Sequence, residues 1–196
     1  MGRASFFFRA MRIQRPNATS GTSVITLAAM KEFLRVDGTD EDDTITALMD
    51  AAVQHCTDYT GRHFTASDGV SFFLERWRSA SLAFGPVTAI NSVTYYDTAG
   101  ALQTLAASKY YNDSLVNGPT RIHFRDVPDL ETYNSTPIEI DCDCGEAASP
   151  NIKHAVRMLT AHWYENRRAV ITATPNEIPM GVKALLNPER IVDFQQ

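Results

Sequence analysis

The chain has 196 residues, 44% of them hydrophobic, and a formal net charge of −5. This length supports one hydrophobic core, and no apolar run approaches the roughly 20 residues that a membrane-spanning helix needs. The negative charge disfavours a general DNA-coating protein, which is normally basic.

The first segment, residues 1–25, is rich in arginine and has no acidic residue. Its apolar cluster, Phe6–Phe8, is followed at once by Arg9, and is therefore too short for a secretory signal. Two interpretations remain, an organellar import peptide and a basic arm that orders only on a partner. We favour the arm and expect it to be flexible and to lie outside the fold core.

Two helices are predicted between residues 26 and 62. Thr26 is placed to cap the first, and Gly61 can end the second in a left-handed conformation. Cys56 lies on the apolar face of the second helix, where we expect a core thiol. The acidic run at the start of this helix consists of Asp40, Glu41, Asp42 and Asp43. Its spacing does not fit a calcium loop, but acids favour the positive end of a helix.

From residue 70 onward, β-branched and aromatic runs alternate with turn residues, which indicates strands. The predicted strands are Val70–Trp77, Ala89–Tyr96, Thr120–Phe124 and Pro137–Asp141, with weaker ones near Leu102 and Tyr110. Asp97–Gly100 reads as a hairpin turn. We therefore expect an α+β protein, mainly an α-helical bundle, with an antiparallel β region inserted at about residues 70–145.

The clearest periodicity belongs to a third long helix, residues 150–168. Ser149 can cap it and Pro150 suits its first position. We expect Trp163 to continue its apolar face into the core. The opposite face carries the basic residues Lys153, Arg157, Arg167 and Arg168. This face is either solvated or part of an interface, and the sequence leaves both readings open.

A short helix after Pro179 should end at Pro188. Apolar residues then recur close to the end of the sequence, at Ile191, Val192 and Phe194. They lie beyond the last periodic core pattern, so we expect them to dock on a partner. Removing Glu189–Gln196 should accordingly leave the folded core unchanged.

The sequence offers little chemistry for catalysis. It contains no P-loop, dinucleotide fingerprint, nucleophile elbow or zincin motif. Cys142 and Cys144 would share one face of a strand, but a zinc site lacks a second cysteine pair or a histidine tandem. The three cysteines are also too few for a disulfide framework, which fits a reducing cytoplasm. We expect no catalytic residues, no metal and no cofactor.

Four segments carry a family resemblance. They are Leu27–Val36 with the acidic run and the turn Thr60-Gly61-Arg62; Gly85-Pro86-Val87 with Val93–Asp97; Pro150–Arg167; and Ile178–Arg190. In this order and spacing they resemble the head-tail connector, or head-completion adaptor, proteins of tailed double-stranded DNA bacteriophages and gene-transfer particles. The resemblance covers residues 26–190 and leaves out the basic arm.

The resemblance implies a non-enzymatic structural protein of the virion neck, assembled in the host cytoplasm. It implies a ring of twelve copies beneath the portal protein, through which genomic DNA passes without sequence-specific binding. The next neck or tail protein would meet the loops of the β region, and no membrane is involved. The portal would take the C-terminal region, for which we nominate Ile178, Leu185, Leu186, Ile191, Val192 and Phe194, with residues 191–196 as a docking tail.

A closed ring requires two different complementary patches on each copy. The acidic run Asp40–Asp43 and the basic residues Arg157, Arg167 and Arg168 are candidates for these patches. The alternatives are another neck or tail-completion component, a small DNA-binding accessory protein that uses the arginine-rich arm, and a hydrolase whose site the sequence does not reveal.

Overall fold

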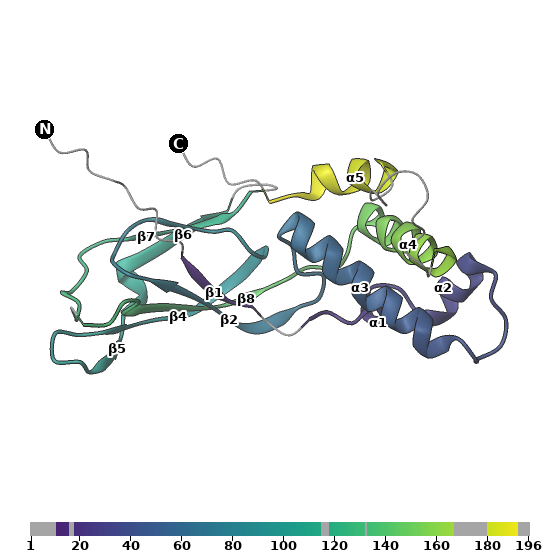
Figure 1. Ribbon diagram of the computed structural model, residues 1–196. Coiled ribbons are helices and arrows are strands. Elements are labelled where there is room, and N and C mark those ends of the chain that lie inside the picture. Colours follow the sequence, from purple (N-terminus) through teal and green to yellow (C-terminus); the bar gives the residue numbers. More distant parts are fainter. Residues whose placement is uncertain (1–10, 16–17, 115–117, 132, 167–179, 192–196) are drawn as a thin grey trace, which may run out of the picture.

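The computed structural model describes residues 11–15, 18–114, 118–131, 133–166 and 180–191. Helices gather at one end of the molecule and strands at the other (Figure 1). Each end has its own cluster of buried apolar side chains. The expectation of a single hydrophobic core is therefore wrong, because the helices and the strands bury their apolar faces separately.

The helical part contains α1 (Gly21–Val24), α2 (Leu27–Leu34), α3 (Asp42–Thr60), α4 (Pro150–Glu165) and α5 (Met180–Leu186). The predicted caps at Thr26, Ser149 and Gly61 are confirmed. Thr26 Oγ1 accepts a hydrogen bond from Ala29 N at 3.3 Å, and Ser149 Oγ accepts one from Ile152 N, also at 3.3 Å. Gly61 ends α3 with a φ of 73°. Over the described segments, no helix is both long and apolar enough to cross a bilayer.

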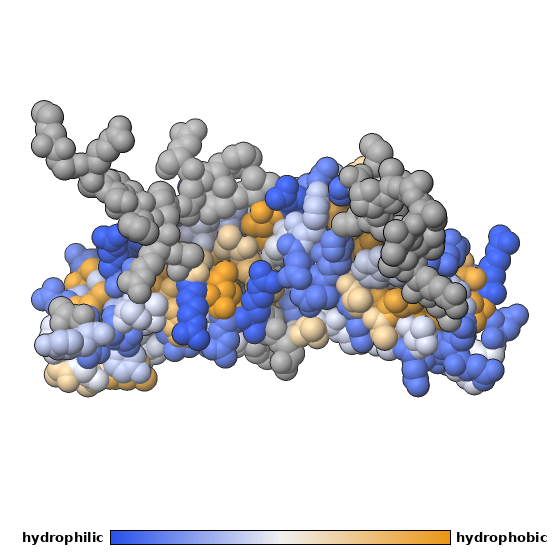
Figure 2. Space-filling model, in the orientation of Figure 1, coloured by the Kyte–Doolittle hydropathy of each residue, from blue (hydrophilic) through white to orange (hydrophobic). Residues whose placement is uncertain are grey.

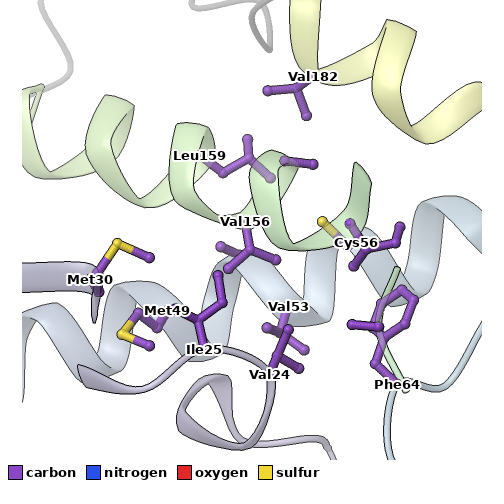
Figure 3. Close-up of a cluster of buried hydrophobic side chains, with 14 of the residues drawn as sticks. Val24, Ile25, Met30, Met49, Val53, Cys56, Phe64, Val156, Leu159 and Val182 are labelled. Carbon is purple, nitrogen blue, oxygen red and sulfur yellow. The ribbon is translucent and has the colours of Figure 1, made fainter. Parts of the chain in front are cut away.

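The helical core forms where α3 and α4 pack against each other, with α2 and α5 alongside. Figure 3 shows Met49 and Val53 of α3 facing Val156 and Leu159 of α4. These residues recur at three- and four-residue steps, which place them on one face of each helix. Cys56 is fully buried in the same core, as predicted.

The strands form two antiparallel sheets. They are β1 (Arg12–Gln14), β2 (Ser67–Leu74), β3 (Ala80–Leu82), β4 (Val87–Tyr96), β5 (Leu102–Thr104), β6 (Tyr110–Ser114), β7 (Thr120–Phe124) and β8 (Ile138–Cys144). The five-stranded sheet has the order β1-β2-β8-β4-β5, and the three-stranded sheet has the order β3-β7-β6. The two sheets share the second core, to which β2, β8 and β7 contribute Phe72, Ile140 and Ile122. Two short 3-10 helices, Ala107–Lys109 and Asn187–Glu189, complete the described elements.

The predicted fold class, a mainly helical bundle with a β insertion, is wrong. Helices take 37% and strands 28% of the described part of the chain, so neither dominates. The strands are not an insertion on the surface of a helical core, because they enclose a hydrophobic core of their own. The molecule is a mixed α+β protein in which a β-sandwich and a helical part lie side by side.

Part of the predicted N-terminal arm belongs to the fold. Arg12–Gln14 form β1, which pairs with β2 at the edge of the larger sheet. Val24 and Ile25 are buried in the helical core. Gly21, which lies between β1 and Val24 in the sequence, packs closely against α3. A Cβ on residue 21 would lie 2.5 Å from Met49 Cβ. The chain therefore crosses from the sandwich to the helices before α2 begins, whereas its sequence predicts a flexible arm outside the core.

Arg62 holds the junction between the two parts. Its side chain is only 7% exposed and forms an ion pair with Glu146, which precedes α4. Its Nε donates to the carbonyl oxygen of Glu189 at 2.5 Å. The Glu189 carboxylate accepts from Ser149 Oγ at 2.7 Å. One guanidinium thus joins the end of α3, the link from β8 to α4, and the segment after α5.

Backbone hydrogen bonds reinforce this junction. His63 N donates to Gly85 O at 2.8 Å and Gly85 N donates to Gly61 O at 3.1 Å. Glu146 N donates to His63 O at 3.1 Å. Ile191 N donates to Thr60 O at 2.8 Å. The turn Thr60-Gly61-Arg62 therefore has a structural role, since it connects both cores and the C-terminal segment.

We expect Arg62→Ala to lower the free energy of unfolding by about 2–3 kcal/mol, measured by urea denaturation. The effect stays below the roughly 3–5 kcal/mol of a fully buried pair, because the Glu146 side chain is 44% exposed and can be hydrated. Arg15→Ala is the matched control. Arg15 and Asp58 are each 52% exposed, so breaking their 2.7 Å pair should change stability by less than about 1 kcal/mol. Equal effects of the two substitutions would contradict the role of Arg62.

Candidate assembly surfaces

The acidic run at the start of α3 is only partly available to a partner. Glu41 accepts a hydrogen bond from the hydroxyl of Tyr164 on α4. Asp42 lies 2.5 Å from Lys31 Nζ of α2. Asp40 and Asp43 remain exposed. Half of this run therefore connects α3 to its own neighbours, which the sequence pattern did not reveal.

On α4, the predicted separation of an apolar and a basic face is observed. Lys153 is exposed and Arg157 is half-buried on the side away from the core. Trp163 is half-buried and packs against the helical core, with its ring 6.4 Å from that of His55. Arg167 and Arg168 lie outside the described residues.

The C-terminal candidates separate into three groups. Leu186 is fully buried in the helical core, so its nomination as a portal contact is corrected. Leu185 and Ile191 are half-buried at the surface. The others, Ile178, Val192 and Phe194, fall outside the described part of the chain.

The expectation that removing residues 189–196 leaves the folded core unchanged disagrees with the contacts of its first residue. Glu189 accepts from Arg62 through its carbonyl and from Ser149 and Asn151 through its carboxylate. Ile191 also bonds to Thr60 through its backbone. The folded body thus includes residue 191, so a truncation that begins after this residue is the one that tests a docking tail.

The cysteines have the environment of core residues. Cys142 and Cys144 point into the sandwich core, and Cys142 Sγ lies 3.3 Å from the carbonyl oxygen of Val70. Burial raises the pKa of Cys142 to about 12 and that of Cys144 to about 11. Thiolates are the metal-binding form of cysteine, so this environment disfavours a metal site. Within the described segments, no group of three or more His, Cys, Asp or Glu side chains could hold a metal ion.

A polar hollow at the junction contains the buried His63. Its ring lies 3.4 Å from Thr19 Oγ1 and 3.3 Å from Thr65 Oγ1. Burial lowers the pKa of His63, which favours the neutral ring. Among the described residues no carboxylate bonds to His63, so the arrangement lacks the third group of a catalytic triad. These contacts instead fasten the N-terminal segment to the start of β2.

Sequence reasoning missed several features on the outer surfaces of the sandwich. Glu139, Asp141 and Asp143 form a row on the outer side of β8. Tyr111 is 55% exposed and stacks on His123, with ring centroids 4.9 Å apart. The strict alternation of apolar and acidic residues in Ile138–Cys144 was the signal for the acidic row. The stack had no local signal, because β6 and β7 bring its two rings together.

The visible surface has no large apolar patch. Apolar areas are interrupted by hydrophilic residues over both the sandwich and the helical part (Figure 2). The exposed large apolar side chains, at Phe33, Leu102, Tyr111 and Tyr133, come from separate elements. Contacts made by this surface therefore depend on charge and polar groups as much as on apolar burial.

Comparison with known proteins gives one family and several solved structures. The family model described as "Head completion protein" matches residues 23–190. A chain in the neck of an empty gene transfer agent particle, computed with C6 symmetry, has a TM-score of 0.74 at 23% identity. A chain in the neck of the native particle, computed with C12 symmetry, has a TM-score of 0.72 at 24% identity. In both cases the match covers 94% of this chain and 98% of the other. The search of curated proteins found no match.

We expect the three thiols to resist labelling in the folded protein. Burial raises the pKa of Cys56 to about 12, and the two sandwich thiols are similarly protonated. A disulfide reagent at pH 8 should react only after denaturant is added. Stability should also fall as the pH rises from about 9 towards 12, since the unfolded thiols ionise near 9 while the folded ones retain their protons. Rapid labelling of the native protein would contradict this description of the cores.

Proposed function

This chain belongs to the head completion protein family, and we propose that it is a structural adaptor of the virion neck that joins the DNA-filled head to the tail. The family match, which spans residues 23–190, carries this proposal. It confirms the resemblance drawn from the four sequence segments. The shared fold with subunits of gene transfer agent necks supports a place in the neck, and the C12 symmetry of one of them supports twelve copies.

The shape of the subunit suits an adaptor. A protein between two partners needs separate surfaces and a fixed relation between them. The helical part and the sandwich provide two ends (Figure 1), and the bonds of Arg62 hold them together. In a ring with heterologous contacts, each copy also presents two different sides to its neighbours.

We assign portal docking to the C-terminal region of the chain, from Ile178 onward. Leu185 and Ile191 are the described members of this surface, and Ile178, Val192 and Phe194 belong to the same assignment. Ile191 supports it because its backbone is anchored to Thr60 while its side chain stays half-buried at the surface. The segment that follows therefore starts from a fixed point on the folded body.

The far end of the sandwich is assigned to the next neck or tail protein. Leu102 is 59% exposed on β5, and Tyr133 is 94% exposed between β7 and β8. The two regions adjoin, since Glu131 N donates to Tyr96 O at 3.1 Å. Exposed apolar and aromatic side chains at the end of a rigid element suit a protein contact.

A structural role also agrees with the charge of the chain. Its net charge of −5 suits a lumen through which DNA passes, because a basic lining would bind phosphates and release counterions. We propose no catalytic activity and no sequence-specific contact with DNA. Strong, salt-dependent DNA binding by the isolated protein would instead favour the DNA-binding accessory role.

The isolated subunit should be a monomer, and the portal should template the ring. The visible surface offers interrupted apolar areas, and such contacts give weak association in solution. Sedimentation at micromolar concentration should show a monomer alone, and a ring should form when purified portal is added. A stable closed ring without portal would rule out templating, and no binding to portal would rule out the proposed adaptor role.

Removing residues 192–196 should leave the melting temperature unchanged and abolish attachment to portal. This truncation keeps every described bond of the segment, including the one from Ile191 N to Thr60 O. Removing residues 189–196 is the comparison, and it should lower the melting temperature because Glu189 bonds to Arg62 and Ser149. Wild-type portal affinity after the shorter truncation would place docking elsewhere, on α2 and α3.

A further inference from the structure

The outer surface of the larger sheet carries a row of three carboxylates. Glu139, Asp141 and Asp143 alternate along β8 with residues that are buried in the sandwich core. β8 is the central strand, so the row lies in the middle of the sheet. Residues two apart on a strand are about 6.7 Å apart on the same side. The row is therefore a regular line of negative charge.

Neighbouring strands hold two of these carboxylates in place. Ser71 Oγ of β2 donates to Glu139 at 2.7 Å, and Asn91 Nδ2 of β4 donates to Asp143 at 2.6 Å. In the described part of the chain, no lysine or arginine forms an ion pair with the row. Neutral groups thus orient two of these carboxylates, and among the described residues none of the three is in an ion pair.

The helical part presents a matching basic line. Lys153 and Arg157 are one turn apart on the side of α4 away from the core, so their Cα atoms are about 6 Å apart along the axis. The exposed His154 lies beside them. Glu165, in the last turn, is the single acid of α4. This spacing is close to that of the carboxylates, and the long side chains can absorb the difference.

The two lines belong to different parts of the molecule and do not pair within it. In the acidic run on α3, in contrast, Lys31 forms an ion pair with Asp42 and so compensates part of the charge. A ring of identical copies requires two unlike surfaces that fit each other but not themselves. An acidic line on the sandwich and a basic line on the helices meet this requirement.

We propose that the acidic row of β8 contacts the basic side of α4 of the neighbouring copy, with Lys153 and Arg157 facing Asp141 and Asp143. This assignment rests on the proposed function, because it names the contact that joins copies in the ring. It replaces the α3 acidic run with β8 as the main acidic side of that contact.

Reversing the charge of either line should prevent ring formation. The first variant combines Asp141→Lys with Asp143→Lys, and the second combines Lys153→Glu with Arg157→Glu. Each variant should keep the wild-type melting temperature and remain a monomer in solution. Its yield of rings on portal should be more than about tenfold lower than that of the wild-type protein. Two further double variants at exposed sites outside both lines, Asp37→Lys with Asp129→Lys and Arg76→Glu with Arg78→Glu, control for the same changes in net charge.

Mixing the two variants gives the sharpest result. In a ring where the two variants alternate, every contact brings opposite charges together. An equimolar mixture should therefore restore assembly. A single chain with all four substitutions should restore it as well. Should the lysine variant not fold, Asp141→Asn with Asp143→Asn removes the charge without reversing it, and should also weaken the ring.

The outcomes separate this proposal from the adaptor role. If wild-type protein forms rings on portal and both variants do so equally well, the contact is wrong and the adaptor role stands. Loss of assembly in both variants without rescue by mixing would also overturn the direct pairing. If wild-type protein forms no ring on portal, the adaptor role itself fails.

Discussion

The buried guanidinium of Arg62 is the interaction on which the arrangement of the two parts depends. A charged group inside a protein is tolerated only when other groups replace the water that it has lost. Glu146 and the carbonyl of Glu189 supply that replacement. They come from segments that lie 84 and 127 residues away along the chain. Because one ion requires both, the three segments cannot move independently without exposing an unsatisfied charge.

The subunit consists of two hydrophobic cores joined by one polar junction, and it differs in this from a globule with a single core. Each core is closed by its own apolar contacts, so either part tolerates changes in its outer surface. The junction has no comparable freedom, since its bonds are few and specific. Contacts made at the sandwich end are therefore positioned by the same residues that anchor Ile191 beside Thr60. This links the two assembly ends of the molecule mechanically.

The sequence predicted local structure better than it predicted arrangement. Thr26, Ser149 and Gly61 have strong local signals, and each has the predicted cap role. The boundaries of β7 match the predicted strand, Thr120–Phe124. β1 and β3 were missed because three-residue strands carry almost no periodicity. Their existence depends on pairing with β2 and β7, which lie far along the chain.

The assembly surfaces were harder to predict for a related reason. The charges of Asp42 and Glu41 are visible in the sequence, but their partners Lys31 and Tyr164 come from other helices. Leu186 and Ile191 are equally apolar in the sequence. Leu186 is buried because α5 packs on α4, and this packing cannot be read from the sequence. Arg62 carried no sign of burial, because its acceptors come together only in the folded chain.

The central position of β8 also affects how the protein is made. Ile138–Cys144 pair with both β2 and β4, which do not pair with each other, so the larger sheet stays open until this strand has been synthesised. The helical core likewise waits for α4, which follows β8 directly. A ribosome must therefore release about three-quarters of the chain before the sandwich core can close, and about five-sixths before α4 can pack on α3. Until then the apolar faces of α3 and β2 depend on transient contacts or on chaperones to avoid aggregation.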